Sequence, residues 1–171
     1  MNFLQTFYPN RYENSTYSID FEKLYKEGIR GLIFDIDNTL VPHGFPADHK
    51  AIELFDNLRK IGFKCCLLSN NKEPRVKMFN EDINVDYIFK ANKPKRSGYR
   101  KAMNLMGTDV KTTVFVGDQL FTDVWGAKRT GIYSILVKPI NPKEEIQIVL
   151  KRYVEKIVLF FYKKHLKKIT K

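Results

Sequence analysis

The stretch that decides the fold runs from Gly31 to Gly44 and reads GLIFDIDNTLVPHG. Its first part, GLIFDID, is a short apolar run that predicts a buried β-strand. Asp35 and Asp37 close this run, and Thr39 follows two residues later. Side chains two residues apart on an extended chain point to the same side. We therefore expect these three polar side chains to face one common point at the carboxyl end of the strand.

The rest of the chain alternates between apolar runs and amphipathic segments. The pattern predicts strands over 31–37, 63–71, 112–119 and 133–140, a short strand followed by a turn within 85–94, and helices over 47–62, 73–83, 94–107 and 122–131. The strand segments are apolar throughout instead of alternating with period two, which is typical of a sheet that is covered on both faces. The sequence thus predicts an α/β fold: three layers around a mainly parallel central sheet.

Single residues indicate where several of these helices begin and end. Gly62 and Gly107 are placed to end two of them, because glycine readily adopts the left-handed conformation of a helix C-terminus. Pro74 suits a first helical turn. Thr122 is placed to cap the helix predicted over 122–131.

Polar residues gather where the predicted strands end. In parallel α/β sheets, ligands bind beyond the carboxyl ends of the strands. The side chains expected at this rim, in chain order, are Asp35, Asp37, Thr39, Ser69, Asn70, Asn71, Lys93, Asp118 and Asp123.

This set of side chains suits a phosphoryl group held by a metal ion. Several carboxylates in a small space repel one another unless a cation lies among them, and oxygen-only ligands favour a hard ion such as Mg²⁺. The Ser69 hydroxyl and the Lys93 ammonium add a donor and a positive charge, and Thr39 can donate to a phosphate oxygen. Of Asp35 and Asp37, one carboxylate can attack phosphorus while the other handles the leaving-group proton.

Each of these signals is weak by itself. Asp-x-Asp after a strand is common in turns, Ser69 alone suits a turn, Lys93 alone suits a solvated surface, and GDQLFTD suits a turn followed by a helix cap. Their joint occurrence at successive strand ends favours an enzyme over these structural explanations.

The motifs resemble those of the haloacid dehalogenase (HAD) superfamily over about residues 28–140. FDIDNTL is similar to its first motif, LLSNN to its second, KP to its third and VGDQLFTD to its fourth. The resemblance implies a Rossmann-like sheet in which the strands of the first and fourth motifs are adjacent, and a phosphatase that forms an aspartyl-phosphate.

The resemblance also implies a role for each site residue. Asp35 would be the nucleophile and Asp37 the general acid and base, while Ser69 and Lys93 would hold the phosphoryl oxygens. Thr39 and Asn70 would bind substrate. The implied metal set is Asp35, Asp37 through its backbone carbonyl, Asp118 and Asp123.

The spacing of the motifs leaves no room for a cap domain. One loop and one helix fill the interval from Thr39 to Ser69, and the interval from Ser69 to Lys93 is similarly short. The chain therefore resembles the capless HAD-IIIA phosphatases of the YqeG type, which are related to phosphatidylglycerophosphate phosphatases. An open, capless site suits large substrates or substrates on a surface.

Composition is consistent with one globular domain. The chain has 171 residues, 43% of them hydrophobic, and a net charge of +11. Residues 143–171 hold nine Lys or Arg and three Glu, a net +6. We assign residues 1–142 to the HAD-like domain and residues 143–171 to a basic amphipathic helix appended to it. Two adjacent cysteines and no evident signal peptide favour a cytoplasmic protein.

The C-terminal helix allows two interpretations. Its predicted apolar face holds Ile146, Leu150, Tyr153, Val154, Ile157 and Phe161. A basic amphipathic helix of this kind can lie on an anionic membrane surface, peripheral to the bilayer. The same face could instead pack on the domain or on a second copy of the chain, and the sequence leaves the oligomeric state open.

Three functions remain open at this point. The first is a Mg²⁺-dependent phosphomonoesterase acting on phosphatidylglycerophosphate or a related phosphate at a membrane surface. The second is a phosphatase of nucleic-acid ends or of soluble small molecules, with nucleic acid the less favoured partner. The third is a non-enzymatic binding or regulatory protein that keeps the HAD fold.

Overall fold

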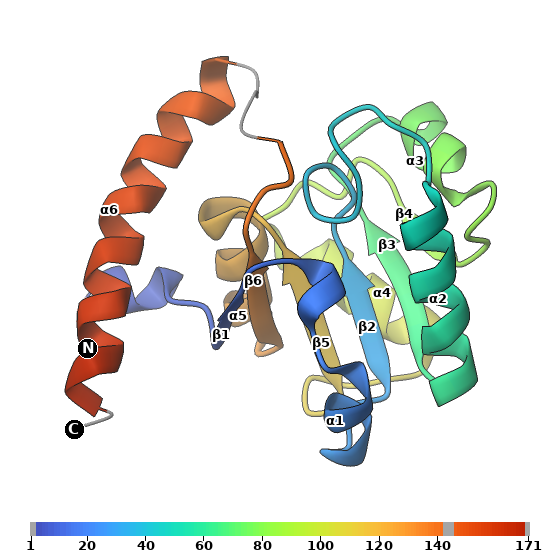
Figure 1. Cartoon of the computed structure of the whole chain (residues 1–171), viewed down its shortest axis with the longest axis horizontal. Helices are drawn as coiled ribbons and strands as arrows, with labels where there is room; N and C mark the ends of the chain where they lie inside the picture. Colours follow the sequence, from blue (N-terminus) through green and yellow to red (C-terminus); the bar gives the residue numbers. More distant parts are fainter. Residues whose placement is uncertain (1–2, 142–145, 170–171) are drawn as a thin grey trace.

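The computed structural model describes residues 3–141 and 146–169, with the side chains of the last helix described from Arg152 onward. One six-stranded parallel sheet has the order β1-β6-β5-β2-β3-β4 (Figure 1). The strands are β1 (Arg11–Glu13), β2 (Gly31–Phe34), β3 (Lys64–Leu68), β4 (Asp86–Ile88), β5 (Thr113–Gly117) and β6 (Tyr133–Val137). The helices are α1 (Phe21–Lys26), α2 (His49–Ile61), α3 (Glu73–Asn80), α4 (Arg96–Met106), α5 (Trp125–Thr130) and α6 (Ile146–Ile169). The predicted three-layer α/β fold is confirmed.

Both faces of the central strands are buried, which explains their unbroken apolar sequences. Leu32 and Phe34 of β2 pack into the cluster that includes residues of α1 and α2. Ile33, between them, packs into the opposite cluster, which includes residues of α4. Alternate residues of one strand therefore serve two cores.

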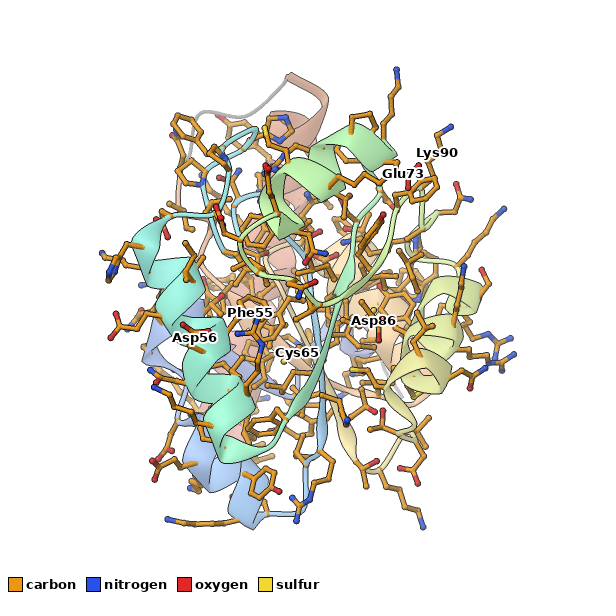
Figure 2. All side chains as sticks on the ribbon, turned by 90° about the vertical axis from the view of Figure 1, so that its right-hand side faces the viewer. Phe55, Asp56, Cys65, Glu73, Asp86 and Lys90 are labelled. Carbon is orange, nitrogen blue, oxygen red and sulfur yellow. The ribbon has the colours of Figure 1, made fainter. Side chains whose placement is uncertain are left out.

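The two cysteines of β3 are structural. Cys65 and Cys66 are free and buried, and Cys65 lies beside α2 in the same core cluster as Phe55, which points inward from that helix (Figure 2). Burial raises the pKa of each thiol to about 12. Neither thiol therefore ionises near neutral pH, as an apolar strand setting predicts.

Most of the predicted helix ends are found. Gly62 and Gly107 end α2 and α4 with positive φ angles of 107° and 64°. The prediction that Thr122 caps a helix is wrong. Winding begins at Gln119 with a π-helical segment, η3 (Leu120–Val124), so Thr122 lies inside that segment, and its hydroxyl donates to Gln119 Oε1 at 3.2 Å.

The N-terminal part of the chain holds elements that the pattern analysis did not resolve. These are η1 (Phe3–Phe7), the edge strand β1, η2 (Thr16–Ser18) and α1. Strand β1 pairs with β6 through the register Tyr12↔Leu136. A three-residue strand is too short for any hydrophobic period to reveal it.

Helix α6 runs along one flank of the sheet, beside η1 (Figure 1). Its Val158 and Tyr162 join a third cluster with Phe7, Tyr8 and Leu136. No helix in the described ranges is long and apolar enough to span a bilayer. The expected boundary between 1–142 and 143–171 falls on residues outside those ranges.

Candidate active site

The site lies where the strand order reverses. Strand β2 pairs with β3 on one side and with β5 on the other. Chain connections therefore leave β2 and β5 toward opposite flanks, which opens a crevice at their carboxyl ends. The expected adjacency of the first- and fourth-motif strands is confirmed, with Phe34 opposite Val116. Among the described residues no separate cap domain covers this crevice.

Asp35 is the first residue beyond β2 and is buried, with its backbone N–H bonded to Val116 O at 3.0 Å. The Lys93 ammonium lies between two carboxylates, 2.5 Å from Asp35 Oδ1 and 2.8 Å from Asp123 Oδ1. Burial alone would lower the pKa of Lys93, but the two carboxylates raise it above its ordinary value. Lys93 is therefore a permanent cation at the centre of the site.

Three buried carboxylates converge beside this lysine. Oxygen atoms of Asp35, Asp118 and Asp123 lie within 4.8 Å of one another. The Thr39 hydroxyl lies between two of them, 3.3 Å from Asp35 Oδ2 and 3.1 Å from Asp118 Oδ1. Burial raises the pKa of Asp35 and of Asp118. Crowded carboxylates with raised pKa values indicate a place for a cation.

A glycine makes the close approach of Asp123 possible. A Cβ atom on Gly117 would lie 2.5 Å from Asp123 Oδ2, well inside van der Waals contact. That oxygen accepts the backbone N–H of Gln119 at 3.0 Å. The Gly-Asp pair of the fourth motif thus combines the buried carboxylate of Asp118 with the space that the Asp123 carboxylate needs.

Asp37 belongs to a different network at the half-buried rim. Its carboxylate accepts from Arg75 Nη2 at 2.8 Å, from Asn71 Nδ2 at 2.7 Å and from the Gly44 N–H at 2.9 Å. The intervening Asn38 has a φ of 62°, a conformation that asparagine tolerates better than most residues. This tight turn separates a buried Asp35 from an Asp37 that lies at the mouth of the site.

The second motif serves mainly to build the site. Ser69 is buried, and its hydroxyl accepts the Asn71 N–H at 3.1 Å. The Asn70 side chain holds the backbone of Lys93 through two hydrogen bonds, of 2.7 Å to its N–H and 3.2 Å to its carbonyl. Asn70, expected at the substrate, is therefore engaged in placing Lys93.

Helix α6 contributes two residues to the site. Arg152 Nη1 donates to the Asp118 carbonyl at 2.6 Å, and Arg152 Nη2 pairs with the Asp118 carboxylate. Glu155, buried one turn later, accepts from Arg152 Nη1 at 2.9 Å and from the Leu120 N–H at 2.7 Å. The end of the fourth-motif strand is thus held from outside the motif region.

Sequence reasoning missed Arg75, Arg152 and Glu155, and it gave Asn71 no role. Asn71 follows the second-motif strand directly, so its position was a usable signal. Arg75 is the third residue of α3, and Arg152 is 34 residues beyond Asp118. No local pattern connects either arginine with the strand ends.

The site does not coincide with the hollow between α1 and α2. A hollow of about 1010 Å³ lies between α1 and α2, and none of the site residues lines it.

A capless parallel sheet with buried carboxylates at its switch point defines the chain as a HAD-type hydrolase. Residues 90–141 match the model of the HAD-hydrolase-like family. The chain is 36% identical over 154 residues, 90% of either chain, to the probable phosphatase YqeG of Bacillus subtilis. The chain belongs to this family of HAD phosphatases and is a phosphatase that acts on phosphorylated substrates.

One further relative and one solved structure are more distant. A phosphatidylglycerophosphate phosphatase of Arabidopsis thaliana is 26% identical over 162 residues, and the match spans 88% of this chain but only 45% of that protein. The cobalt-bound deoxy-D-mannose-octulosonate 8-phosphate phosphatase of Haemophilus influenzae superposes with a TM-score of 0.52 at 15% identity, over 68% of this chain and 81% of that one. This second likeness shows the fold alone.

Proposed function

We propose that this protein is a Mg²⁺-dependent phosphomonoesterase that forms an aspartyl-phosphate on Asp35. The observation that carries the proposal is the position of Asp35, at the switch point between Lys93 and the Asp118–Asp123 pair. Lys93 contacts Asp35 Oδ1, whereas Asp35 Oδ2 accepts only the long 3.3 Å bond from Thr39 among the described contacts. Oδ2 is therefore the oxygen suited to attack.

The residues present fit a magnesium ion. The ligand atoms available from Asp35, Asp118 and Asp123 are all oxygen, which hard divalent cations prefer. The ion would supply electrostatic stabilisation of the charge on the transferring phosphoryl group. The charged groups of the described site are the carboxylates of Asp35, Asp37, Asp118, Asp123 and Glu155 and the cations Lys93, Arg75 and Arg152. These five carboxylates and three cations sum to a net charge of −2, which one divalent cation would neutralise.

The proposed reaction has two steps that share one acid and base. In the first, the Asp35 carboxylate forms a bond to phosphorus, the phosphorus–oxygen bond to the leaving alcohol breaks, and Asp37 gives that oxygen a proton. In the second, a water molecule attacks the aspartyl-phosphate, Asp37 takes its proton, and inorganic phosphate leaves as Asp35 is regenerated. Lys93, Thr39 and Ser69 hold the phosphoryl oxygens.

The position of Asp37 supports this division of roles. It lies at the mouth of the site, where a leaving group would depart, and three donors fix its carboxylate. A fixed orientation favours proton transfer to one atom. Asp35 lies deeper in the site, in contact with Lys93, which suits the nucleophile better than the acid.

The chemistry is tested by chelation and by trapping the intermediate. Hydrolysis of p-nitrophenyl phosphate should stop in EDTA and return with Mg²⁺. Acid quenching during turnover of a ³²P-labelled substrate should leave label on Asp35, found by peptide mapping. Full activity in EDTA would remove the metal from the mechanism, and label on another residue would remove Asp35.

For the substrate we propose phosphatidylglycerophosphate or a related phosphate at a membrane surface. Three observations support it: the lack of a separate cap domain among the described residues, the name of the Arabidopsis relative, and the outward face of α6. That outward face exposes Tyr153, Val154, Ile157, Phe160 and Phe161. Exposed lysines accompany it at 156, 163, 164, 167 and 168. Apolar side chains with flanking cations suit an anionic lipid surface.

The surface is tested by vesicle flotation. The wild-type protein should float with vesicles rich in anionic lipid, and binding should weaken as salt rises. The double variant Ile157→Ser/Phe160→Ser should lose flotation and hydrolysis of vesicle-borne phosphatidylglycerophosphate, yet keep activity on p-nitrophenyl phosphate. Leu105→Ser is the matched control, because Leu105 is an exposed apolar residue on α4. Unchanged flotation of the double variant would overturn the membrane assignment.

Nucleic-acid ends remain the second candidate because the net charge of +11 suits a phosphate backbone. A 5′- or 3′-phosphorylated single-stranded oligonucleotide, assayed beside the lipid, separates the two. A higher kcat/KM for the oligonucleotide than for the lipid would favour the nucleic-acid substrate.

A further inference from the structure

We propose that Arg152 of α6 is a positioning residue of the active site, which holds the Asp118 carboxylate in the orientation that binds the metal ion. The role rests on the proposed metal-dependent function and deepens it. It would make α6 a part of the catalytic centre and not only an appended surface.

Arg152 grips Asp118 at two points. One guanidinium nitrogen donates to the backbone carbonyl of Asp118 at 2.6 Å, and the other pairs with its carboxylate. Fixing both ends of one residue removes the freedom of its side chain to rotate. The Asp118 side chain is fully buried and the Arg152 side chain is 15% exposed, so water screens this contact only in part.

Glu155 holds the arginine in turn. It follows Arg152 by three residues, so both lie on the inward side of α6, the side that also carries the buried Val158 and Tyr162. Glu155 Oε2 accepts from Arg152 at 2.9 Å, and Oε1 accepts the Leu120 N–H at 2.7 Å. Leu120 begins the η3 segment that carries Asp123. The Arg152–Glu155 pair therefore connects the segments of both fourth-motif aspartates.

Two opposite effects of Arg152 on the metal can be distinguished. As a cation it repels a divalent ion, so its removal would tighten binding. As a clamp it preorganises Asp118, and loss of such an outer partner weakens metal binding by about 10- to 100-fold in known sites. We expect preorganisation to dominate, because the charge of Arg152 is balanced by the carboxylates of Asp118 and Glu155. Arg152 also holds the backbone carbonyl of Asp118.

The test is a Mg²⁺ titration of the full-length protein by isothermal calorimetry, without substrate. Arg152→Gln should raise the Kd for Mg²⁺ by about 10- to 100-fold. Arg152→Lys keeps the charge but loses the two-point contact with Asp118. Its Kd for Mg²⁺ should therefore lie between those of wild type and Arg152→Gln. Lys156→Gln is the control. It removes the same charge from α6, but Lys156 contacts Tyr153 on the outward side of the helix and not Asp118.

Steady-state kinetics give a second readout. In Arg152→Gln the Mg²⁺ concentration for half-maximal hydrolysis of p-nitrophenyl phosphate should rise in step with Kd. Saturating Mg²⁺ should restore most of kcat, because Arg152 acts through Asp118. An unchanged or lower Kd in Arg152→Gln overturns the proposal, and so does a loss of kcat that excess Mg²⁺ does not restore.

A second variant covers the case in which Arg152→Gln does not fold. Glu155→Gln keeps an acceptor for the Leu120 N–H and removes only the charge that faces Arg152. A rise in the Mg²⁺ Kd of Glu155→Gln, smaller than the rise expected for Arg152→Gln, supports the role of Arg152, and an unchanged Kd overturns it. A wild-type protein with no saturable Mg²⁺ isotherm would overturn the proposed metal chemistry itself, whereas normal wild-type binding with unaffected variants removes only the role of Arg152.

Discussion

The rim of the sheet and helix α6 place their polar and apolar groups in opposite ways. At the rim, charged side chains are buried together: Asp35, Lys93, Asp118 and Asp123 are all nearly inaccessible. On α6 the apolar residues Ile157 and Phe160 are exposed, while charged Glu155 is buried. Arg152 and Glu155 of α6 connect the two regions through their hydrogen bonds to the Asp118 carbonyl and the Leu120 N–H.

The difference teaches what each region is built to do. Buried like charges cost stability unless something compensates them, and such costs are usual at catalytic centres. Exposed aromatic side chains cost solubility and mark surfaces that meet another phase or molecule. The rim thus has an excess of buried negative charge, which supports the proposed cation site, and α6 has exposed apolar side chains, which support the proposed contact with a lipid surface.

The largest effect is expected from Asp35→Asn. The amide cannot attack phosphorus, so kcat should fall on the order of 10³-fold or more. Stability should not fall with it. Burial raises the pKa of Asp35, so its ionised form opposes folding at neutral pH, and the neutral amide removes that cost. The melting temperature of the metal-free variant, followed by circular dichroism, should equal or exceed that of wild type.

A lower melting temperature for Asp35→Asn would show that the buried charge of Asp35 does not oppose folding. Retained hydrolysis above a few per cent of wild type would refute the nucleophile assignment.

Lys93→Met should lower both stability and activity, because it removes the cation of the rim instead of one of its carboxylates. It leaves the Asp35 and Asp123 carboxylates facing each other without their shared cation. Removing one partner of a buried ion pair costs about 3–5 kcal/mol, and losing a phosphoryl donor costs kcat about 10²- to 10³-fold. Urea unfolding with and without Mg²⁺ measures the first effect, and initial rates measure the second.

Added Mg²⁺ should recover part of the stability lost in Lys93→Met, because the ion replaces some of the missing charge. Equal stability of Lys93→Met and wild type in EDTA would contradict the view of Lys93 as the internal counter-ion.

The sequence predicted the rim far better than the helix, for a physical reason. Each motif residue follows a strand whose apolar run is unmistakable, and parallel strand ends must meet, so Asp35, Ser69, Lys93 and Asp118 could be brought together without coordinates. Thr122 was misplaced as a cap because the helix starts with a π-helical segment, which leaves no distinct period in the sequence. Strand β1 was missed because three residues are too few to show a period.

The helix shows where such reasoning ends. Its hydrophobic pattern identified the face that includes Tyr153, Val154, Ile157 and Phe161, but a pattern does not say whether that face turns inward. In the structure these four are exposed, and Val158 and Tyr162 make the packing contacts. The other members of the predicted face, Ile146 and Leu150, have side chains outside the described residues. Arg152 reaches Asp118 only because α6 packs by the narrower face.

The smallest effect tests that orientation with two valines of one helix. Val158 is 3% exposed and Val154 is 51% exposed. Val158→Ala removes two methyl groups from the cluster with Tyr8 and Leu136 and should cost about 1.5–2 kcal/mol at about 0.8 kcal/mol per buried carbon. Val154→Ala should change stability by less than about 0.5 kcal/mol, as exposed sites do. Both substitutions change helix propensity alike, so the difference in urea midpoint isolates burial. Equal effects of the two would mean that α6 does not rest on the sheet by its Val158 side, and the Arg152 contact with Asp118 would lose its structural basis.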